Sequence, residues 1–421
     1  MSTTSMSTKP ADAGTLPVVV IGGGPAGMMA AVEAARRGLR VLLLEHNEKL
    51  GKKLYITGKG RCNLTNATPR ETHIAHARRN GKFLYGALTR LDAQGLMDYV
   101  ERLSVPLVVE RGERVFPASY KASDVTRAFE RELARLGVTV LLRTGAKDIV
   151  TEEGVARAVL TTDGRRIDCR SVVVATGGLS YPSTGSTGDG YRLAAALGHR
   201  VQPTSPTLVS VTTAESWPGE LAGLSLRNVR LTVLRGKKNV WSEIGEMLFT
   251  HTGVSGPLVL TASSYLEADR LADDRLVLDA KPGLDAEQLD ARLVRDFQAN
   301  PNRSVKNQLP ELLPARMAPI VADLAGIPAD QSCHQVSRPQ RERLTAMMKN
   351  LVLTPSALGS WNEAVVTRGG VACTEVDPKT MQSKLVQGLF FCGEVLDVDA
   401  QTGGFNLQIA FSTGYTAGQC C

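Results

Sequence analysis

The sequence predicts an α/β protein in which a nucleotide-binding domain, built around a parallel sheet, is interrupted by an inserted domain. Three observations support this fold class. Short apolar runs alternate with helical patterns over the first 200 residues, closely spaced β-like runs and then helices follow, and a strand and a helix return at the end of the chain. Alternation of strand and helix is typical of a parallel sheet. Its return after the interruption indicates that both ends of the chain contribute to one discontinuous domain.

Length and composition limit the class of protein. The chain has 421 residues, of which 43% are apolar and 22% are charged. This is a globular composition, and at ~100–200 residues per domain the length indicates more than one domain. No run approaches the ~20 apolar residues that cross a bilayer, so we expect no membrane span. Residues 1–15 are rich in Ser and Thr without an apolar centre, and we predict a disordered tail rather than a secretory signal.

Cysteine usage and charge bear on the compartment and the partners. The seven cysteines are odd in number and mostly single, which favours a reducing, cytoplasmic location without disulfides. No cluster of Cys and His has metal-ligand spacing, so we expect no metal. The net charge of +7 comes from Lys and Arg residues that are interleaved with acidic ones. Such interleaving is typical of a solvated surface and does not favour nucleic acid as a partner.

The chain opens with a βαβ unit. Residues 17–22 and 40–45 are apolar and β-branched, which predicts two buried strands, and residues 26–37 between them predict a helix that Gly38 ends. The unit has the ~30 residues that a parallel crossover needs. We expect a further helix over 123–136 and strands over 138–143, 146–150, 155–161 and 172–175.

A glycine fingerprint joins the first strand to the first helix. The pattern G-x-G-x-x-G is formed by Gly22, Gly23, Gly24, Pro25, Ala26 and Gly27. In this motif the first glycine permits a tight turn, the second lets the backbone approach a pyrophosphate, and the third lets helix and strand pack closely. The helix N-terminus supplies N–H groups to the phosphates. Glu45, at the end of the next strand, is expected to accept hydrogen bonds from a ribose diol and to repel a 2′-phosphate.

A second cofactor wall is predicted in the loop after that strand. Glycines and cations at Lys53, Gly58, Gly60 and Arg61 suit a diphosphate, and Cys62 and Asn63 continue the loop. Because no second cysteine forms a C-x-x-C pair with Cys62, we predict a structural or contacting role for this thiol rather than redox chemistry.

Two further blocks follow buried strands, where small residues let a flat ligand approach. The strand at 172–175 leads into Ala175, Thr176 and Gly177. The strand at 388–392 leads into Gly393, Glu394, Asp397, Gly403, Gly404, Phe405 and Asn406. We expect Asp397 to accept from a polyol chain. Backbone N–H groups at Gly403 and Gly404 would meet the N1–C2=O edge of a flavin and stabilise its anionic reduced form.

The middle of the chain has the pattern of an insertion. Residues 207–280 contain short β-like runs, among them 229–234 and 275–280, and residues 285–353 are helical in pattern. We therefore divide the chain into the tail at 1–15, the first part of the cofactor domain at 16–200, an inserted domain at 201–355 and the second part at 356–421.

Taken together, these blocks resemble the BaiN-like family of bacterial flavoproteins, also labelled aminoacetone-oxidase-like. The resemblance spans about Pro17 to Gly418 and implies a two-dinucleotide-binding-type (Rossmann-like) domain, non-covalent FAD and an inserted domain. It also implies NAD(P)H-linked reduction of conjugated enones as one activity. The chain stops soon after the last motif, so we expect a short closing helix. The matching strings are GKGRCNLTN at 58–66, VFPASYKASDV at 115–125, ATGGLSYPSTGSTGDGY at 175–191, LFTHTGVSGP at 248–257, GGVACTEVDPKTMQSK at 369–384 and GLFFCGEVLDVDAQTGGFNLQIAFSTGY at 388–415.

The resulting hypothesis is an FAD-dependent oxidoreductase. We expect a reductase that takes hydride from NAD(P)H onto flavin N5 and passes it to a small conjugated or carbonyl acceptor. No second G-x-G-x-x-G is present, so the nicotinamide would bind only transiently. His251 and Tyr181 are the candidate proton donors. The alternatives are a flavin oxidase of a small amine and a flavin-containing RNA-binding or RNA-modifying protein; the oligomeric state is not indicated.

Overall fold

The computed structural model describes residues 16–328 and 330–421, so the tail predicted at 1–15 lies outside the described residues. The chain divides into two compact units. Unit 1 combines the residues up to Pro206 with Ala364–Cys421, and unit 2 comprises Thr207–Glu363. The chain enters unit 2 once and returns, so unit 1 is discontinuous. The divisions fall a few residues after the proposed boundaries at 201 and 356.

Unit 1 is built on a parallel sheet with the strand order β20-β10-β1-β2-β6. Its strands are β1 (Val18–Ile21), β2 (Val41–Glu45), β6 (Thr139–Leu142), β10 (Ser171–Val174) and β20 (Leu389–Phe391). Every residue of β1, β10 and β20 is buried, as strands covered on both faces require. The strand order reverses between β1 and β10. In such sheets ligands bind beyond the carboxyl ends of the strands at this point.

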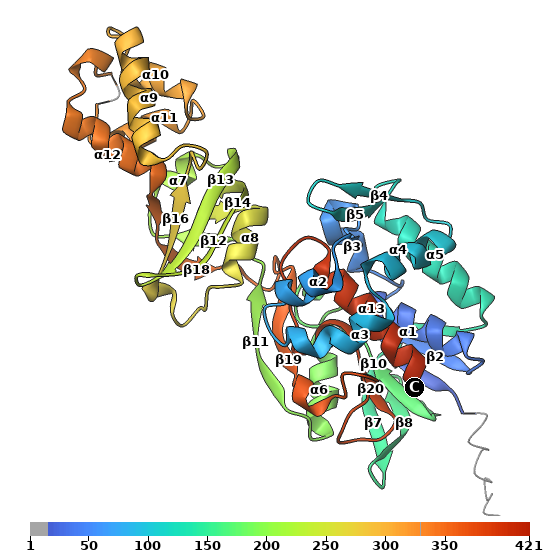
Figure 1. Ribbon diagram of the computed structural model, residues 1–421. Coiled ribbons are helices and arrows are strands. Elements are labelled where there is room, and N and C mark those ends of the chain that lie inside the picture. The colour runs from blue at the N-terminus through green and yellow to red at the C-terminus, as the bar shows by residue number, and fades with distance from the viewer. Residues whose placement is uncertain (1–15, 329) are drawn as a thin grey trace, which may run out of the picture. The chain divides into compact units, whose positions relative to one another are not determined.

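The first and last helices of unit 1 pack side by side (Figure 1). These are α1 (Pro25–Arg36) and α13 (Phe405–Cys420). A Cβ at Gly418 would lie 2.5 Å from Ala30 O, so only glycine lets the two backbones approach this closely. The expectation of a short closing helix is wrong, because α13 has 16 residues and Arg37 Nη1 donates to Cys421 O at 2.8 Å. This packing holds α13 against α1.

Smaller elements complete unit 1. Two three-stranded sheets come between these strands along the chain: β3-β5-β4 lies between β2 and β6, and β7-β8-β9 lies between β6 and β10. The pair β11-β19 joins the strand after β10 to the strand before β20. The helices are α2 (Arg70–His76), α3 (Tyr85–Arg90), α4 (Ala93–Arg102), α5 (Ala122–Arg135) and α6 (Asp189–Ala196), with 3-10 turns η1 (Leu54–Gly60), η3 (Pro182–Thr184) and η8 (Gly393–Val395). The strands are β3 (Thr65–Asn66), β4 (Leu107–Glu110), β5 (Arg114–Pro117), β7 (Ala146–Glu152), β8 (Val155–Thr161), β9 (Arg166–Asp168), β11 (Val201–Thr207) and β19 (Val366–Val371).

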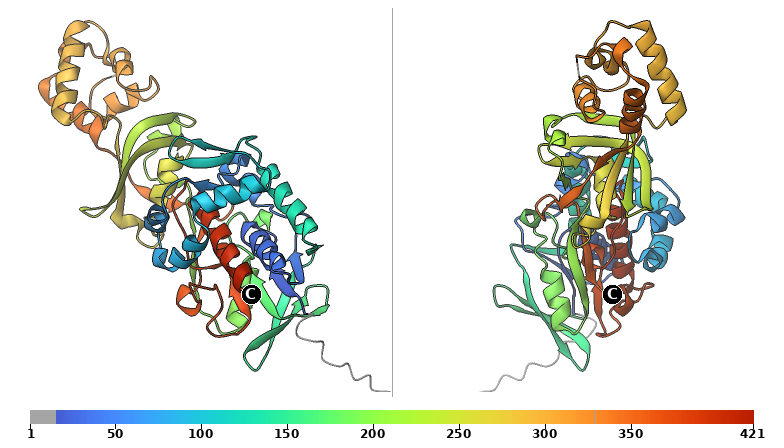
Figure 2. Two further views of the ribbon diagram at one scale, coloured as in Figure 1. Left: turned by 45° about the vertical axis from the view of Figure 1, so that its right-hand side comes forward. Right: turned by 90° about the vertical axis from the view of Figure 1, so that its left-hand side faces the viewer.

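Unit 2 is an antiparallel sheet with helices inserted before its last two strands, so the β-rich and then helical order that the sequence predicts is followed by a return to the sheet. The strand order is β17-β16-β13-β14-β15-β12-β18. Its strands are β12 (Val211–Thr213), β13 (Ser225–Arg235), β14 (Lys238–Thr250), β15 (Gly253–Ser255), β16 (Asp274–Asp279), β17 (Leu351–Leu353) and β18 (Pro355–Leu358). Its helices are α7 (Trp217–Glu220), α8 (Pro257–Ser263), α9 (Ala286–Ala299), α10 (Val305–Gln308), α11 (Ala318–Leu324) and α12 (Arg338–Lys349). Figure 2 shows α9–α12 gathered at one end of this sheet.

Each unit has its own apolar core. In unit 1, α1 packs against the parallel sheet, and α5 and α13 pack against α1. In unit 2, α8 and α12 pack against the sheet, and α9 packs against α12. Among residues 16–328 and 330–421, no helix combines the length and apolar character needed to cross a membrane. The same residues contain no group of three or more His, Cys, Asp or Glu side chains placed to hold a metal ion.

Candidate cofactor-binding site

The fingerprint glycines divide into two that the fold requires and one that faces open space. A Cβ at Gly22, whose φ is 105°, would lie 2.5 Å from Ala175 O. A Cβ at Gly27 would overlap Gly22 O. At Gly24, the residue that precedes α1, no atom of the described chain beyond the adjoining residues lies within 4 Å of the Cβ position. The turn therefore leaves a space in front of the helix N-terminus, where the sequence places a pyrophosphate.

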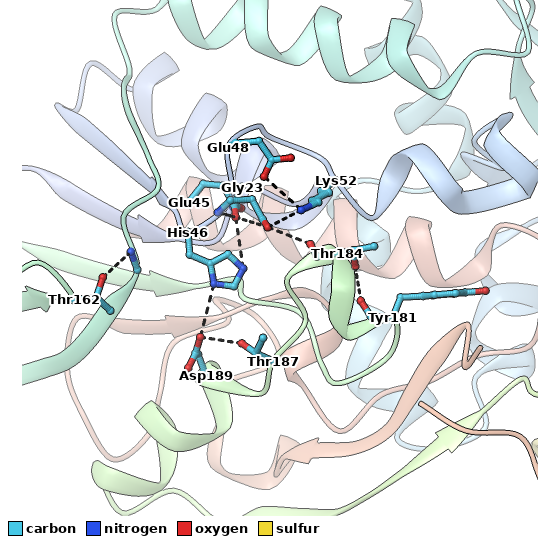
Figure 3. Close-up of polar contacts among 12 residues, drawn as sticks. Gly23, Glu45, His46, Glu48, Lys52, Thr162, Tyr181, Thr184, Thr187 and Asp189 are labelled. Carbon is cyan, nitrogen blue, oxygen red and sulfur yellow. Dashed lines mark hydrogen bonds and ion pairs between the residues drawn. The ribbon is translucent and has the colours of Figure 1, made fainter. Parts of the chain in front are cut away.

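Glu45 is held in place by the turn beside it. The side chain is buried at the end of β2, and Oε2 accepts from Gly23 N at 2.7 Å (Figure 3). Oε1 accepts from both Asn47 N and Asn47 Nδ2 at 2.8 Å. Since each carboxylate oxygen can accept about two hydrogen bonds, Oε2 keeps a free acceptor position. This arrangement suits the ribose role predicted for Glu45.

The loop around η3 folds over the residues that follow Glu45. Asn47 Nδ2 donates to Thr184 O at 3.1 Å, and the His46 ring lies 3.9 Å from Asp189 Oδ2. Tyr181 precedes η3 with a φ of 51°, and in Figure 3 its side chain points away from Glu45. The proton donor proposed at Tyr181 is therefore not directed at the ribose end of the site.

A partly buried ion pair connects three of the sequence blocks. Lys53 Nζ lies 2.6 Å from Glu394 Oε2 and donates to Ser180 Oγ at 2.5 Å. Glu394 Oε1 accepts from Ser180 Oγ at 2.5 Å and from Thr367 N at 2.9 Å. Burial opposes ionisation of Glu394, but the charge of Lys53 and these hydrogen bonds outweigh it, so the pKa of Glu394 is lowered. Ser180 and Thr367 were missed by the sequence analysis, because nothing in the sequence near either residue indicates this contact.

The loop at 58–63 contains two residues with a strained backbone, and Arg61 in this loop contacts neighbouring strands. Lys59 and Cys62 have φ values of 58° and 60°. Arg61 Nη1 donates to Glu110 Oε1 at 3.1 Å, and its guanidinium lies 4.4 Å from the Phe116 ring centroid. Arg61 is thus bound to β4 and β5. Burial raises the pKa of Cys62 to about 12, so the thiol is protonated at neutral pH.

The loop before α13 meets the end of the 58–66 segment. Gly403 and Gly404 have φ values of 122° and 103°, which favour glycine, and Asn66 Nδ2 donates to Gly403 O at 3.1 Å. Asn63 lies beside the same turn, and with its side-chain amide turned over its oxygen accepts from Gly404 N at 3.1 Å. Asn406 Nδ2 donates to Ala400 O at 2.8 Å and so holds the loop itself. The structure thereby joins two blocks that are far apart in sequence.

The other predicted residues lie on the carboxyl side of the strands or at helix starts. Gly393 N donates to Thr413 Oγ1 at 2.9 Å, and a Cβ at Gly393 would lie 2.8 Å from Ala26 Cβ. Pro25 begins α1, and Phe405 stacks on His76 with ring centroids 4.4 Å apart. Gly177 has a φ of 74°. His251 lies elsewhere, in an exposed turn between β14 and β15 of unit 2.

Buried polar atoms without partners test whether these residues fit FAD. Asp397 Oδ2 accepts from Asn80 Nδ2 at 3.1 Å, but Oδ1 has no partner among the described residues. Thr176 Oγ1, Asn66 Oδ1 and both carboxyl oxygens of Asp399 are also buried and unpaired in the part of the chain that the structure describes. Such atoms are rare in folded proteins. These atoms lie in the blocks predicted to bind FAD, and others, such as His199 Nδ1 and Thr345 Oγ1, lie outside them. The open space at Gly24 is what fits the phosphate groups of such a ligand.

Comparison with known proteins also identifies a Rossmann-type domain in this chain. The family described as HI0933-like protein Rossmann domain matches residues 16–420. The chain is 31% identical over 401 residues to the ribosomal RNA dihydrouridine synthase of Escherichia coli, which covers 95% of this chain and 96% of that protein. It is 30% identical over 404 residues to the 3-dehydro-bile acid delta(4,6)-reductase of Clostridium scindens. The alignment covers 95% of this chain and 97% of that protein.

Among solved structures, a quinol-fumarate reductase aligns with a TM-score of 0.50 and 15% identity over 96% of this chain and 70% of that chain. This likeness concerns the fold. The resemblance drawn from the sequence motifs is confirmed by the family match over almost the whole chain. The chain belongs to the HI0933-like family of Rossmann-domain proteins, and it is an FAD-dependent oxidoreductase.

Proposed function

We propose that the protein reduces a carbon–carbon double bond that is conjugated to a carbonyl group. The similarity to two relatives carries this proposal. One is named for making dihydrouridine and the other for a delta(4,6)-reduction of a 3-dehydro bile acid. Dihydrouridine is uridine whose C5=C6 bond, conjugated to the C4 carbonyl, has been reduced. A 3-dehydro delta(4,6) steroid likewise has its double bonds conjugated to a carbonyl. The substrates differ, but the bond that accepts hydride is of one chemical class.

The residues of unit 1 would support this chemistry by holding the cofactor. When bound, FAD supplies hydride transfer between a nicotinamide donor and the acceptor carbon. The space at Gly24 would take the pyrophosphate, Glu45 the ribose and Asp397 the polyol chain. We propose NAD(P)H as a donor that binds transiently, because the chain has a single dinucleotide fingerprint.

Reduction of a conjugated bond also needs a proton at the carbon beside the carbonyl. We propose His251 for this role, with Tyr181 as the other candidate. An imidazole is a suitable acid because it titrates near neutral pH. The exposed position of His251 in its turn is compatible with contact to a substrate.

A second candidate substrate is a uridine within RNA. The 31% identity to the ribosomal RNA enzyme over 95% of this chain favours it, as does the net charge of +7. The dispersed pattern of the charges favours a small molecule instead. A titration with ribosomal RNA across salt concentration separates the two, since binding to RNA phosphates weakens steeply as salt rises.

Anaerobic stopped-flow kinetics test the proposed reaction. Bleaching of the bound flavin by NADH or NADPH, followed by re-oxidation with 2-cyclohexenone or a uridine-containing RNA, is the expected result. Bleaching by a small amine, with oxygen as the only oxidant that restores the colour, would establish an amine oxidase and overturn the proposal. The two acceptors distinguish the two candidate substrates.

A further inference from the structure

Residues 72–91 concentrate positive charge on unit 1. This segment has four Lys and Arg residues and no Asp or Glu, whereas acidic and basic residues are interleaved over the chain as a whole. It covers most of α2, the 3-10 turn η2 (Gly81–Leu84) and α3, and Figure 1 shows α2 and α3 side by side. Arg79, Lys82 and Arg90 are exposed, and none of the three forms an ion pair with a described residue. Their charge is therefore available to an anionic partner.

An aromatic side chain lies on the same segment. Tyr85, the first residue of α3, is 55% exposed. The guanidinium of Arg70 lies 4.4 Å from the centroid of its ring and donates to Thr89 Oγ1 at 2.9 Å, one helical turn further along α3. Glu71 accepts two hydrogen bonds from the same guanidinium and so holds it in place. An exposed ring that rests on a fixed guanidinium is suited to stacking on an unpaired base.

A further cation comes from a distant part of the sequence. A Cβ at Gly86 would lie 2.6 Å from Pro378 O and 3.5 Å from Lys379 Cα, so the turn at 377–380 packs on α3. Lys379 is exposed, and the acidic residue of this turn, Asp377, accepts from Lys379 N at 2.8 Å. Cations from two segments thus lie around the start of α3. The basic surface comprises the exposed residues Arg79, Lys82, Tyr85 and Lys379.

Hydrogen bonds join this segment to the loop that is predicted to bind FAD. Asn80 Nδ2 donates to Asp397 Oδ2 at 3.1 Å, and Gln401 N donates to His76 O at 3.1 Å. The charge of Arg79 also acts on Asp397, where it opposes the rise in pKa that burial causes. The basic surface therefore adjoins the loop that we propose for the polyol chain.

We propose that the basic surface binds a single strand of RNA, with phosphates at its three cations and one unpaired base stacked on Tyr85. The inference rests on the second candidate substrate of the proposed function, a uridine within RNA. Lys and Arg neutralise phosphates whatever the sequence, and an aromatic ring stacks on any base. An acidic protein would also meet the cations, but it carries no base for the exposed ring. The combination of charge and ring favours RNA.

The experiment uses the full chain with FAD bound and measures RNA binding without turnover. The double variant Lys82→Gln/Lys379→Gln removes two cations, and Tyr85→Ala removes the ring. Arg79 is left unchanged, because its charge acts on Asp397 in the proposed FAD site. Fluorescence anisotropy with a labelled, uridine-containing single strand of ~12 nucleotides gives the affinity at several KCl concentrations.

The matched controls remove the same groups from another face of unit 1. Arg127→Gln/Arg131→Gln takes the same charge from exposed positions on α5. Tyr120→Ala removes a second exposed ring, since Tyr120 is 42% exposed. FAD content and kcat/KM with 2-cyclohexenone are measured for every variant, and both should stay near wild type if the fold and the cofactor site are intact.

A phosphate contact and a stacking contact predict different changes. Each phosphate contact to a single strand adds ~0.7 to the slope of log affinity against log salt, so the lysine variant should lose ~1.4 of slope. Its affinity at low salt should fall ~10-fold or more. Tyr85→Ala should bind ~10-fold more weakly with an unchanged slope, because stacking releases no counterions. Both controls should bind RNA as wild type does.

Four results would overturn the proposal. Wild-type protein that binds no RNA, or binding that neither variant weakens, would show that RNA is not held here. An equal loss in the α5 control would indicate attraction to net charge alone. Polyglutamate that displaces the RNA as well as unlabelled RNA does would assign the surface to an acidic protein. Wild-type protein that reduces neither 2-cyclohexenone nor uridine in RNA would instead overturn the proposed function, and the binding data would still decide where RNA binds.

Discussion

At the scale of single residues, Gly24 and Gly27 have opposite roles although they are three positions apart. A Cβ at Gly27 would overlap the carbonyl oxygen of Gly22, so the turn cannot form as it is with a side chain there. No atom of the described residues other than its chain neighbours lies within 4 Å of the Cβ position at Gly24. Packing within the fold explains the glycine at 27, whereas no packed segment requires a glycine at 24, where the sequence predicts a pyrophosphate.

Gly24→Val should therefore fold normally and fail to retain FAD, because its side chain occupies the space in front of α1. Gly27→Ala, the matched control, should lose ~1–3 kcal/mol of stability through overpacking. Urea unfolding of the apo proteins and the ratio of FAD to protein after purification measure the two effects. Gly24→Val protein that stays yellow at normal stoichiometry would show that the pyrophosphate lies elsewhere.

His251 can be tested with little risk to the fold, because it lies in an exposed turn. If it donates the proton, His251→Ala should slow re-oxidation by an organic acceptor ~100-fold or more, since general acids contribute ~10²–10⁴-fold. Flavin reduction and FAD content should stay near wild type. Single-turnover kinetics of each half-reaction measure this. Equal loss in both half-reactions would indicate a role in folding or binding, and no loss in either would exclude His251 as the acid.

At the scale of elements, the Lys53–Glu394 pair connects the loop after β2 with η8, and Ser180 and Thr367 add the segment after β10 and strand β19. These elements lie far apart in sequence. The pair therefore fixes the relative positions of segments that are predicted to surround one cofactor.

Replacing one residue of the Lys53–Glu394 pair leaves the other without its partner, so the effects of the two single substitutions should not be additive. Lys53→Met and Glu394→Gln should each destabilise the apo protein by ~1–3 kcal/mol, because each leaves a largely buried partner unsatisfied. The double variant should be more stable than the sum of the single effects predicts. Urea unfolding of all four proteins gives the coupling. Additive effects would show that the two side chains do not stabilise each other.

The same pair predicts a pH dependence. Because the pKa of Glu394 is lowered in the folded protein, its ionised form stabilises the fold above the ordinary Glu value of ~4.3. This contribution is lost as the pH falls through the lower folded value. The stability difference between wild type and Glu394→Gln should thus be largest at neutral pH and should shrink below about pH 4. A difference that grows on acidification would contradict the lowered pKa.

At the scale of the whole molecule, unit 1 is made from both ends of the chain, and the blocks predicted to bind FAD come from both. A ligand that contacts Gly24 and Asp397 together would connect these ends. Its binding energy is then added to the stability of the folded chain.

Purified protein should release FAD rather than FMN on denaturation, because the Gly24 space and Glu45 would be unused by FMN. FAD at 100 times its dissociation constant should add ~2.7 kcal/mol of stability. Mass spectrometry of the released cofactor and melting of apo and holo protein check this. Release of FMN, or equal melting temperatures, would overturn the assignment of the site.

The sequence by itself determined the elements that depend on consecutive residues. The apolar runs at 17–22 and 40–45 and the glycine fingerprint between them predicted β1, α1 and β2 to within a residue or two, because strand burial and turn geometry are local properties. The order of an interrupted α/β domain followed from the same patterns. The chemistry of the cofactor blocks was likewise visible, since glycines that directly follow buried parallel strands are typical of turns that approach a nucleotide.

Only the tertiary structure decided which polar side chains are already satisfied. Arg61, predicted at a diphosphate, contacts Glu110 and Phe116, and Asn406 hydrogen-bonds within its own loop. Conversely, Asp399 has the same composition as any loop aspartate, yet it is fully buried and unpaired among the described residues. Whether a polar group has a partner depends on every segment packed around it. Segments distant in sequence supply those partners, so local patterns carry no signal for them.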